Sequence, residues 1–211
     1  PLDDPRAVHI ISVLQCGHGD EFDAGIINGC RGKGIIRSVS SCALTLDFVF
    51  PDHNVKEELY PVTFVAGLPR PQTARKILRE ITSLGVSALY FTCTEKGEPS
   101  YRKSRLWTTG ECRKHLITGA EQAFSTLLPR VEVFSSLCVC MDALPPGNRV
   151  ALDNYEGVKS LTSCTYSREW TVILVGPEKG WSAGERDLLR QRDCILVHCG
   201  SRVLRSETAS V

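Results

Sequence analysis

The stretch ILVGPEKGWSAGERDLL, residues 173–189, joins an apolar run to an expected helix through a turn that contains two glycines. An unbroken apolar run before Gly176 is typical of a central strand in a parallel sheet. Ser182 and Glu185, three residues apart, predict a capping box at the start of the helix. Glycines at the carboxyl end of a parallel strand let the backbone approach a ligand. Residues 176–180 are therefore either a ligand-binding turn or a tight connection that needs glycine for geometry alone.

This turn lacks the motifs of the common nucleotide sites. The sequence has no G-x-x-x-x-G-K-[ST], and no G-x-G-x-x-G opens a helix after a strand. Nucleotide hydrolysis and dinucleotide-dependent oxidoreduction are therefore disfavoured. Glu178 in the turn suits a cationic ligand better than a pyrophosphate.

A second polar cluster, HCGSRVLRSETASV at residues 198–211, also follows an apolar run. Arg202, Arg205, Glu207 and Thr208 gather there around two apolar residues. An exposed helix start would explain the charges alone, but Val203 and Leu204 need burial. The mixture favours a loop that lines a ligand.

Composition places the chain among soluble globular proteins, with 42% hydrophobic and 23% charged residues in 211. The formal net charge is only +1, so binding to nucleic acid would depend on local basic patches. No apolar run approaches the roughly 20 residues of a membrane span. The N-terminus also lacks the features of a signal peptide. We expect a soluble cytoplasmic protein that does not contact membranes.

The ten cysteines contain no C-x-x-C pair, and the histidines show no ligand spacing, so we expect no metal site. Cys93, Cys194 and Cys199 lie in or beside apolar runs. Free cysteines in such positions behave as small buried hydrophobes. We expect these roles rather than disulfides, as in a reducing compartment.

The pattern of apolar runs changes along the chain. Residues 8–50 combine short apolar runs, beginning with VHIISVL, with frequent glycine, which predicts a small module of antiparallel strands. The polar, proline-bounded segment 51–61 is the expected linker. Beyond it, apolar runs alternate with helical patterns, which predicts an α/β fold with a parallel sheet. The expected strands are 62–68, 86–92, 130–134, 149–154, 171–176 and 194–200.

Two further helices are expected in this part of the chain. The first begins at Pro71, has one apolar face and is closed by Gly85. Thr108 and Glu111 predict a capping box for the second, which reaches about Leu127.

The two C-terminal motifs, ILVGPEKGWSAGERDLL and CGSRVLRSETA, resemble those of the RsmE family of ribosomal RNA methyltransferases in the SPOUT superfamily. Weaker similarity covers HIISVLQCGHGDEF, GLPRPQTARKILREITSLGV and GAEQ. The resemblance implies an N-terminal PUA-like β-barrel that binds RNA (1–58). It also implies a SPOUT domain (59–211) whose mostly parallel sheet forms a trefoil knot. Physical topology rules would not have predicted a knot.

The resemblance also implies an activity. Members use S-adenosylmethionine to methylate N3 of a uridine in small-subunit (16S) ribosomal RNA, as homodimers with the site near the subunit interface. The cofactor loops map onto Leu152 with Asp153, Gly176 to Gly180, and Cys199 to Thr208. The implied cofactor-binding residues are Leu152, Val175, Gly176, Pro177, Glu178, Gly180, Cys199, Gly200, Val203, Leu204 and Thr208.

Uracil N3 carries a proton, so methyl transfer requires a base or a group that stabilises the deprotonated ring. Arg205 is the expected stabilising group, because a fixed guanidinium supplies positive charge beside O2 or O4. Glu207 or Glu178 is the expected proton acceptor, although either could instead hold a loop in place. RNA contacts are expected from two basic stretches, in which Tyr101 or Trp107 could stack on a base and Arg75 and Lys76 could form a solvated helix face. The expected RNA-binding residues are Arg70, Arg79, Tyr101, Arg102, Lys103 and Arg105.

Three positions depart from the family pattern. Lys179 replaces a glycine, Ser201 replaces a proline, and AFSTLLPR follows Gln122 where the family continues Ser-Gly-Arg. Two alternatives therefore remain: a SPOUT methyltransferase with another RNA target, and a non-catalytic RNA-binding relative.

Overall fold

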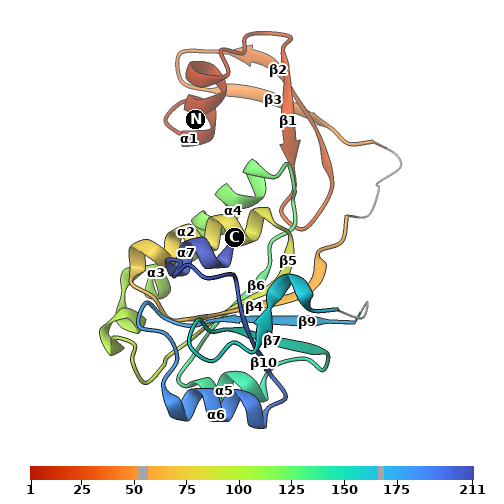
Figure 1. Cartoon of the computed structure of the whole chain (residues 1–211). Helices are drawn as coiled ribbons and strands as arrows, with labels where there is room; N and C mark the ends of the chain where they lie inside the picture. The colour runs from red at the N-terminus through yellow and green to blue at the C-terminus, as the bar shows by residue number, and fades with distance from the viewer. Residues whose placement is uncertain (52–56, 166–168) are drawn as a thin grey trace. The chain divides into compact units, whose positions relative to one another are not determined.

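The computed structural model describes residues 1–51, 57–165 and 169–211. The chain divides into two compact units (Figure 1). The first consists of Pro1–Glu57 with Ser125–Leu127, and the second of Glu58–Phe124 with Leu128–Val211. Residues 52–56 of the expected linker, 51–61, lie outside the described residues, and its last two residues belong to the first strand of the second unit.

The first unit contains the expected antiparallel strands. Its sheet has the order β1-β2-β3, formed by Glu21–Gly25, Arg31–Val39 and Leu44–Val49. The strand expected at VHIISVL was wrong. The chain there is helical, with α1 at Pro5–Val8 followed by a π-helical turn at His9–Val13.

The N-terminal helix is specified by the residues that precede VHIISVL. The Asp4 carboxylate accepts a hydrogen bond from the backbone N–H of Arg6 at 2.9 Å. Pro5 occupies the first helical position, where its missing N–H costs nothing. These signals start a helix that continues through a run whose composition alone also suits a strand.

The second unit is built on a seven-stranded sheet with the order β6-β5-β4-β9-β7-β10-β8, and all its pairings are parallel. The six expected strands are all present, which confirms the α/β prediction. The short strand β8 was not expected. The strands are β4 Tyr60–Gly67, β5 Val86–Thr92, β6 Arg130–Phe134, β7 Asn148–Leu152, β8 Lys159–Ser160, β9 Thr171–Val175 and β10 Ile195–His198.

Helices cover both faces of this sheet (Figure 1). The side of α2, α3, α4 and α7 encloses one apolar cluster, and the side of α5 and α6 encloses another. Successive residues of β9 alternate between them: Val172 and Leu174 belong to the α5–α6 cluster, and Ile173 and Val175 to the other. The helices are α2 Pro71–Ser83, α3 Arg105–Thr108, α4 Glu111–Gln122, α5 Leu137–Asp142, α6 Ala183–Gln191 and α7 Ser206–Ser210.

The capping box expected at the start of α6 is confirmed. Ser182 Oγ accepts from the backbone N–H of Glu185 at 3.0 Å, and the Glu185 carboxylate accepts from the N–H of Ser182 at 2.8 Å. Both residues are buried. The start of α6 is thus fixed by local chemistry that the sequence already contains.

The capping box expected at Thr108 is wrong. The residue before α4 is Gly110, in the left-handed conformation with φ 74°. Thr108 instead ends α3, where its hydroxyl donates to the Ser104 carbonyl at 3.3 Å. The Glu111 carboxylate accepts from Arg75 Nε of α2 at 2.6 Å. A tertiary ion pair therefore takes the side chain that the local motif needed.

Helix α4 is also shorter than expected. It ends at Gln122 rather than near Leu127, and Phe124 follows with a positive φ of 53°. Residues 125–127 then belong to the first unit. The helical periodicity of this segment gave no sign of that change.

Gly119 of α4 allows close packing on α2. A Cβ at this position would clash with the carbonyl oxygen of Arg79 and lie 2.9 Å from Thr82 Cβ. We expect Gly119→Ala to lower the free energy of unfolding by about 1–3 kcal/mol, although alanine is the better helix former. Urea denaturation measures the change, with the exposed Glu121→Ala as the control on the same helix. A Gly119→Ala protein as stable as wild type would contradict this packing.

Candidate functional site

Three turns meet the carboxyl edge of the sheet at neighbouring strands. Strands β9, β7 and β10 are adjacent and parallel, so Val175, Leu152 and His198 end at the same edge. Leu152 pairs with Val175 on one side, and its strand pairs with β10 on the other. The turns at 176–180 and 199–205 therefore flank the turn that follows β7. This edge is where open α/β sheets bind ligands.

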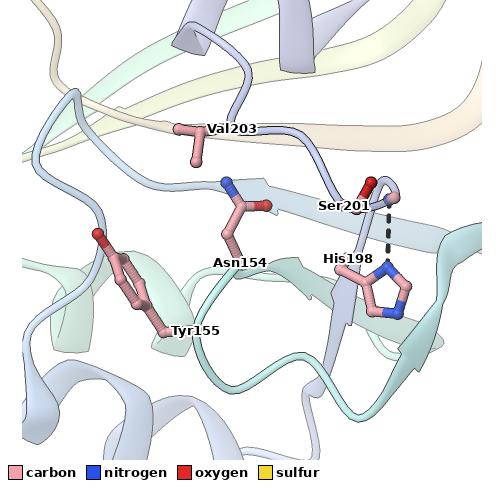
Figure 2. Close-up of a pocket in the computed structure, with 6 residues that line it drawn as sticks. Asn154, Tyr155, His198, Ser201 and Val203 are labelled. Carbon is pink, nitrogen blue, oxygen red and sulfur yellow. Dashed lines mark hydrogen bonds between the residues drawn. The ribbon is translucent and has the colours of Figure 1, made fainter.

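An open cavity of about 400 Å³, most of whose lining residues are exposed, lies at this edge, at the β7 and β10 turns (Figure 2). This volume falls in the range of small-molecule sites. The wall combines an aromatic ring, an aliphatic side chain and several polar groups. The lining residues are Asn154, Tyr155, His198, Gly200, Ser201 and Val203.

The turn after β7 is held by the buried Asp153. One carboxylate oxygen accepts from the backbone N–H groups of Tyr155 and Glu156, at 2.8 and 2.7 Å. The other accepts from Arg186 Nε of α6 at 2.7 Å, and both partners of this ion pair are buried. The Arg186 guanidinium also lies 5.5 Å from the centre of the Tyr155 ring. This one carboxylate thus positions the aromatic wall of the cavity.

The turn after β9 is fixed to the end of β7 by Trp181. The Trp181 side chain is completely buried, and its Nε1 donates to the Leu152 carbonyl at 3.1 Å. Lys96 Nζ donates to the carbonyl of Trp181 at 2.8 Å. Gly180 has a positive φ of 65°, and Pro177 packs against Gly67 at the end of β4. The positive φ at residue 180 favours glycine there.

Glu178 makes a contact away from the cavity. Its carboxylate accepts from the backbone N–H of Arg70 at 3.2 Å, which ties the turn after β9 to the turn after β4. Of its two expected roles, this contact favours holding a loop over accepting a proton.

His198 supports the turn after β10. Its Nδ1 accepts from the backbone N–H of Gly200 at 3.1 Å (Figure 2). The neutral ring therefore carries its proton on Nε2. Gly200 has a positive φ of 107°, and a Cβ there would meet no neighbour within 4 Å. Glycine is needed for the backbone of this turn rather than for packing.

The segment after the cavity leads into α7. Arg205 is exposed and precedes the first residue of this helix. Glu207 forms an ion pair with Lys76 of α2 at 3.6 Å. A hydrogen bond from its own backbone N–H, and then the charge of Lys76, lower the pKa of the Glu207 carboxyl. A lower pKa makes this carboxylate a weaker base.

Of the expected cofactor residues, Gly200 and Val203 line the cavity. The burial expected for Val203 was wrong, because this residue is 82% exposed. Val175 and Pro177 are buried, Leu152, Gly176, Gly180 and Leu204 are half-buried, and Glu178, Cys199 and Thr208 are exposed. The expectation of a buried Cys199 was wrong, because Cys199 follows the last residue of β10. Cys194 is buried as expected, Cys93 is half-buried, and all ten cysteines are free.

Asn154 and Tyr155 were not expected as cavity residues, whereas Ser201 lies within the expected cofactor loop 199–208 but was not named among the binding residues. The strand was expected to run to 154, whereas β7 ends at Leu152. The available signal in the sequence was the pair of polar residues Asp153 and Asn154, followed by the aromatic Tyr155, directly after the apolar run.

The expected RNA-binding residues fall into two groups. Arg70 follows β4, and residues 101–105 lie in the connection after β5, so both belong to the carboxyl edge. Arg70, Arg102, Lys103 and Arg105 are exposed. Arg79 is half-buried within α2. Tyr101 and Trp107 pack against the apolar cluster of the α2 face, and the Trp107 ring lies 4.7 Å from that of Phe91.

The described part of the chain contains no group of three or more His, Cys, Asp or Glu side chains that could hold a metal ion. None of its helices is both long and apolar enough to cross a membrane.

Fold and site together define an α/β protein with a ligand cavity at the carboxyl edge of a parallel sheet. The family model described as RNA methyltransferase domain matches residues 56–211. The ribosomal RNA small subunit methyltransferase E of Treponema pallidum is 35% identical over 98% of this chain and 80% of its own length. The Borreliella burgdorferi methyltransferase E 1 is 28% identical over 100% of this chain and 88% of its own. This chain belongs to the ribosomal RNA small subunit methyltransferase E family, which confirms the resemblance.

A solved structure shares the fold. The methyltransferase E of Neisseria gonorrhoeae, described as bound to S-adenosyl methionine, aligns with a TM-score of 0.80 at 20% identity. The alignment covers 97% of this chain and 85% of that one.

The Asp153–Arg186 pair yields a prediction. Asp153→Asn removes the buried counter-charge of the Arg186 guanidinium and leaves only the more exposed Glu156 carboxylate, 3.6 Å away. We therefore expect the free energy of unfolding to fall by about 3 kcal/mol. Equilibrium denaturation measures the loss. The control is Asp187→Asn, which removes an exposed ion pair with Arg190 and is expected to cost less than about 1 kcal/mol. Equal stability of the two variants would show that the buried pair does not support the fold.

Proposed function

We propose that this protein is an S-adenosylmethionine-dependent methyltransferase that modifies N3 of a uridine in small-subunit (16S) ribosomal RNA. The observation that carries the proposal is the cavity at the β7 and β10 turns, whose wall includes Gly200 and Val203 of the family's C-terminal motif. Family membership supports the reaction class. A ribosomal RNA substrate places the protein in the cytoplasm.

The cavity residues fit the proposed cofactor. A nucleoside needs apolar surface for its base and hydrogen-bonding groups for its polar edges. Tyr155 and Val203 offer apolar surface, and Asn154 and Ser201 offer polar groups. The open space beside Gly200 lets a ligand approach the backbone. S-adenosylmethionine bound there would supply an electrophilic methyl group.

The residues after the cavity would prepare the uridine. Arg205 lies two residues beyond Val203, which lines the cavity, and its guanidinium would stabilise the negative charge that develops on O2 or O4 when N3 loses its proton. Glu207 was the expected proton acceptor, but its ion pair with Lys76 and the lowered pKa of its carboxyl support a positioning role instead.

The path of the chain supports a trefoil knot. After β10, beyond β7 in the sheet, residues 199–205 lead to α7, which packs against α2 and also contacts β9. The chain therefore crosses the carboxyl ends of β7 and β9 (Figure 1). Val203 on this crossing lines the same cavity as Asn154 and Tyr155 of the β7–β9 connection. In our proposal the crossing passes through that connection and forms the knot.

The remaining parts of the proposal concern organisation. The first unit would be a PUA-like barrel that binds RNA, with the domain boundary between residues 58 and 59, and its antiparallel strands β1 to β3 would be part of that barrel. Two chains would form a homodimer with the cavity near the interface. A different RNA target is the second candidate, because Ala123, Phe124 and Ser125 stand where the family has Ser-Gly-Arg.

Cofactor binding provides the first test. We expect calorimetry to show one S-adenosylmethionine bound per chain, and Tyr155→Ala to weaken binding about tenfold, or about 1.4 kcal/mol, because the aromatic wall is lost. Val158→Ala is the control, since Val158 is exposed in the same connection but does not line the cavity. A wild-type protein that binds no cofactor would be a non-catalytic relative.

Arg205→Ala provides the second test. We expect kcat for methylation of small-subunit ribosomal RNA to fall about 10²- to 10³-fold, because a preorganised charge is removed from the developing anion. Affinity for S-adenosylmethionine should be retained. Arg202→Ala, an exposed arginine of the same segment, should have a much smaller effect. Unchanged turnover in Arg205→Ala would exclude the catalytic role, and mass spectrometry of the product identifies the modified nucleotide.

A further inference from the structure

The turn after β9 carries a lysine that no described contact explains. Lys179 is exposed, and its ammonium has no hydrogen bond or ion pair among residues 1–51, 57–165 and 169–211. Its backbone is held, because Lys96 Nζ donates to the Lys179 carbonyl at 3.5 Å and to that of Trp181 at 2.8 Å. Lys179 does not adopt a positive φ, unlike Gly180 at 65°. A long side chain therefore stands on a fixed backbone without strain.

Two neighbouring turns are joined to this one. Strands β5, β4 and β9 are adjacent in the sheet, so the turns that follow them share an edge. The Glu178 carboxylate links the β9 turn to the β4 turn through the Arg70 N–H, and Lys96 links it to the β5 turn. Arg70, Lys96 and Lys179 thus lie on three bonded turns, which we call the three-turn patch.

The patch has positive charge available for a partner. Arg70 uses its Nε to donate to Thr73 at 3.3 Å, which leaves its two terminal nitrogens without a described partner. Elsewhere in this unit, many cations pair with carboxylates, as Arg75 does with Glu111 and Arg192 with Asp142. The ammonium of Lys96 is already used, because it donates to the backbone carbonyls of Lys179 and Trp181. Arg70 and Lys179 are therefore the groups in the patch that are free to meet an external anion.

The carboxylate of the cofactor is the less suitable partner for Lys179. The cavity is lined by the turns after β7 and β10, and Lys179 is not among its lining residues. The other two turns of the three-turn patch follow β4 and β5, which lie on the side of β9 away from β7 and β10. The turn after β9 lies between the cavity and the turns after β4 and β5. An RNA strand that presents a base to the cavity would therefore have a backbone phosphate within reach of Lys179.

We propose that Lys179, supported by Arg70, binds a backbone phosphate of the RNA strand beside the nucleotide to be methylated. The inference rests on the proposed function and adds a substrate contact to it. The resembled family usually has a glycine at this position, which could not make the contact. Lys96 acts as a positioning residue that holds the turn.

Salt dependence of RNA binding tests this contact. With a transcript of small-subunit ribosomal RNA, we expect Lys179→Gln to raise the apparent Kd about 3- to 10-fold. The slope of log K against log salt should decrease by about 0.7 to 0.9, the amount for one lost phosphate contact. Affinity for S-adenosylmethionine should match wild type, and Lys179→Arg should restore the slope. The control is Arg130→Gln, since Arg130 begins β6 at the opposite edge and should leave the slope unchanged.

The outcomes separate the inference from the proposed function. If wild type methylates RNA and Lys179→Gln has the wild-type slope, only the inference is overturned. If Lys179→Gln weakens cofactor binding and keeps the slope, Lys179 contacts the cofactor and the inference is again wrong. If wild type neither binds S-adenosylmethionine nor methylates RNA, the proposed function fails, whereas a reduced slope in Lys179→Gln would still establish the phosphate contact.

Discussion

The buried ion pair between Asp153 and Arg186 is the interaction on which the site depends. Removing two charges from water is costly, and the cost is met only where each charge is fully hydrogen-bonded. Asp153 meets this condition with two backbone N–H groups and the Arg186 guanidinium. The turn after β7 is therefore stabilised both by its own backbone and by α6. Helix α6 is in turn placed by its capping box and by the completely buried Trp181. The cavity is thus a product of the packed unit rather than of its loops alone.

The turn after β9 lies between two different regions of one sheet edge, the cavity and the three-turn patch. On the side of β7 and β10 lies the cavity with its aromatic and polar lining, to which residues 176–180 do not contribute. On the side of β4 and β5 the turn after β9 is bonded to turns that carry cations. Because Trp181 and Glu178 tie the same turn to both sides, the distance between the two regions is fixed by the fold. A rigid spacing of this kind suits a reaction between a small ligand and a much larger polyanion.

The sequence predicted most of the second unit because its signals are local. Unbroken apolar runs indicate central parallel strands, and Ser182 with Glu185 specifies a helix start within four residues. The errors arose where distant residues decide the outcome. Glu111 pairs with Arg75 of another helix instead of capping its own. Tyr155 lines the cavity because the Asp153 carboxylate holds its backbone, and Asp153 is held in turn by Arg186 on a later helix. No rule of sequence spacing links Asp153 to Arg186. At residues 8–14 a short apolar run suits either a strand or a helix, and the preceding Asp4 and Pro5 decide it.

The place of β9 in the sheet has a consequence for how the chain reaches its native state. Strand β9 lies between β4 and β7, although both precede it in the sequence. Until β9 emerges from the ribosome, β4 and β7 each present an unpaired edge to solvent, and pairing them with each other would exclude it. The sheet can therefore be completed only after β9 has been made, through contacts between residues far apart in the sequence. Such contacts form slowly, and the unpaired strand edges are meanwhile open to aggregation. A chaperone that shields such edges during synthesis would act on this protein at the stage when β7 is complete and β9 is not.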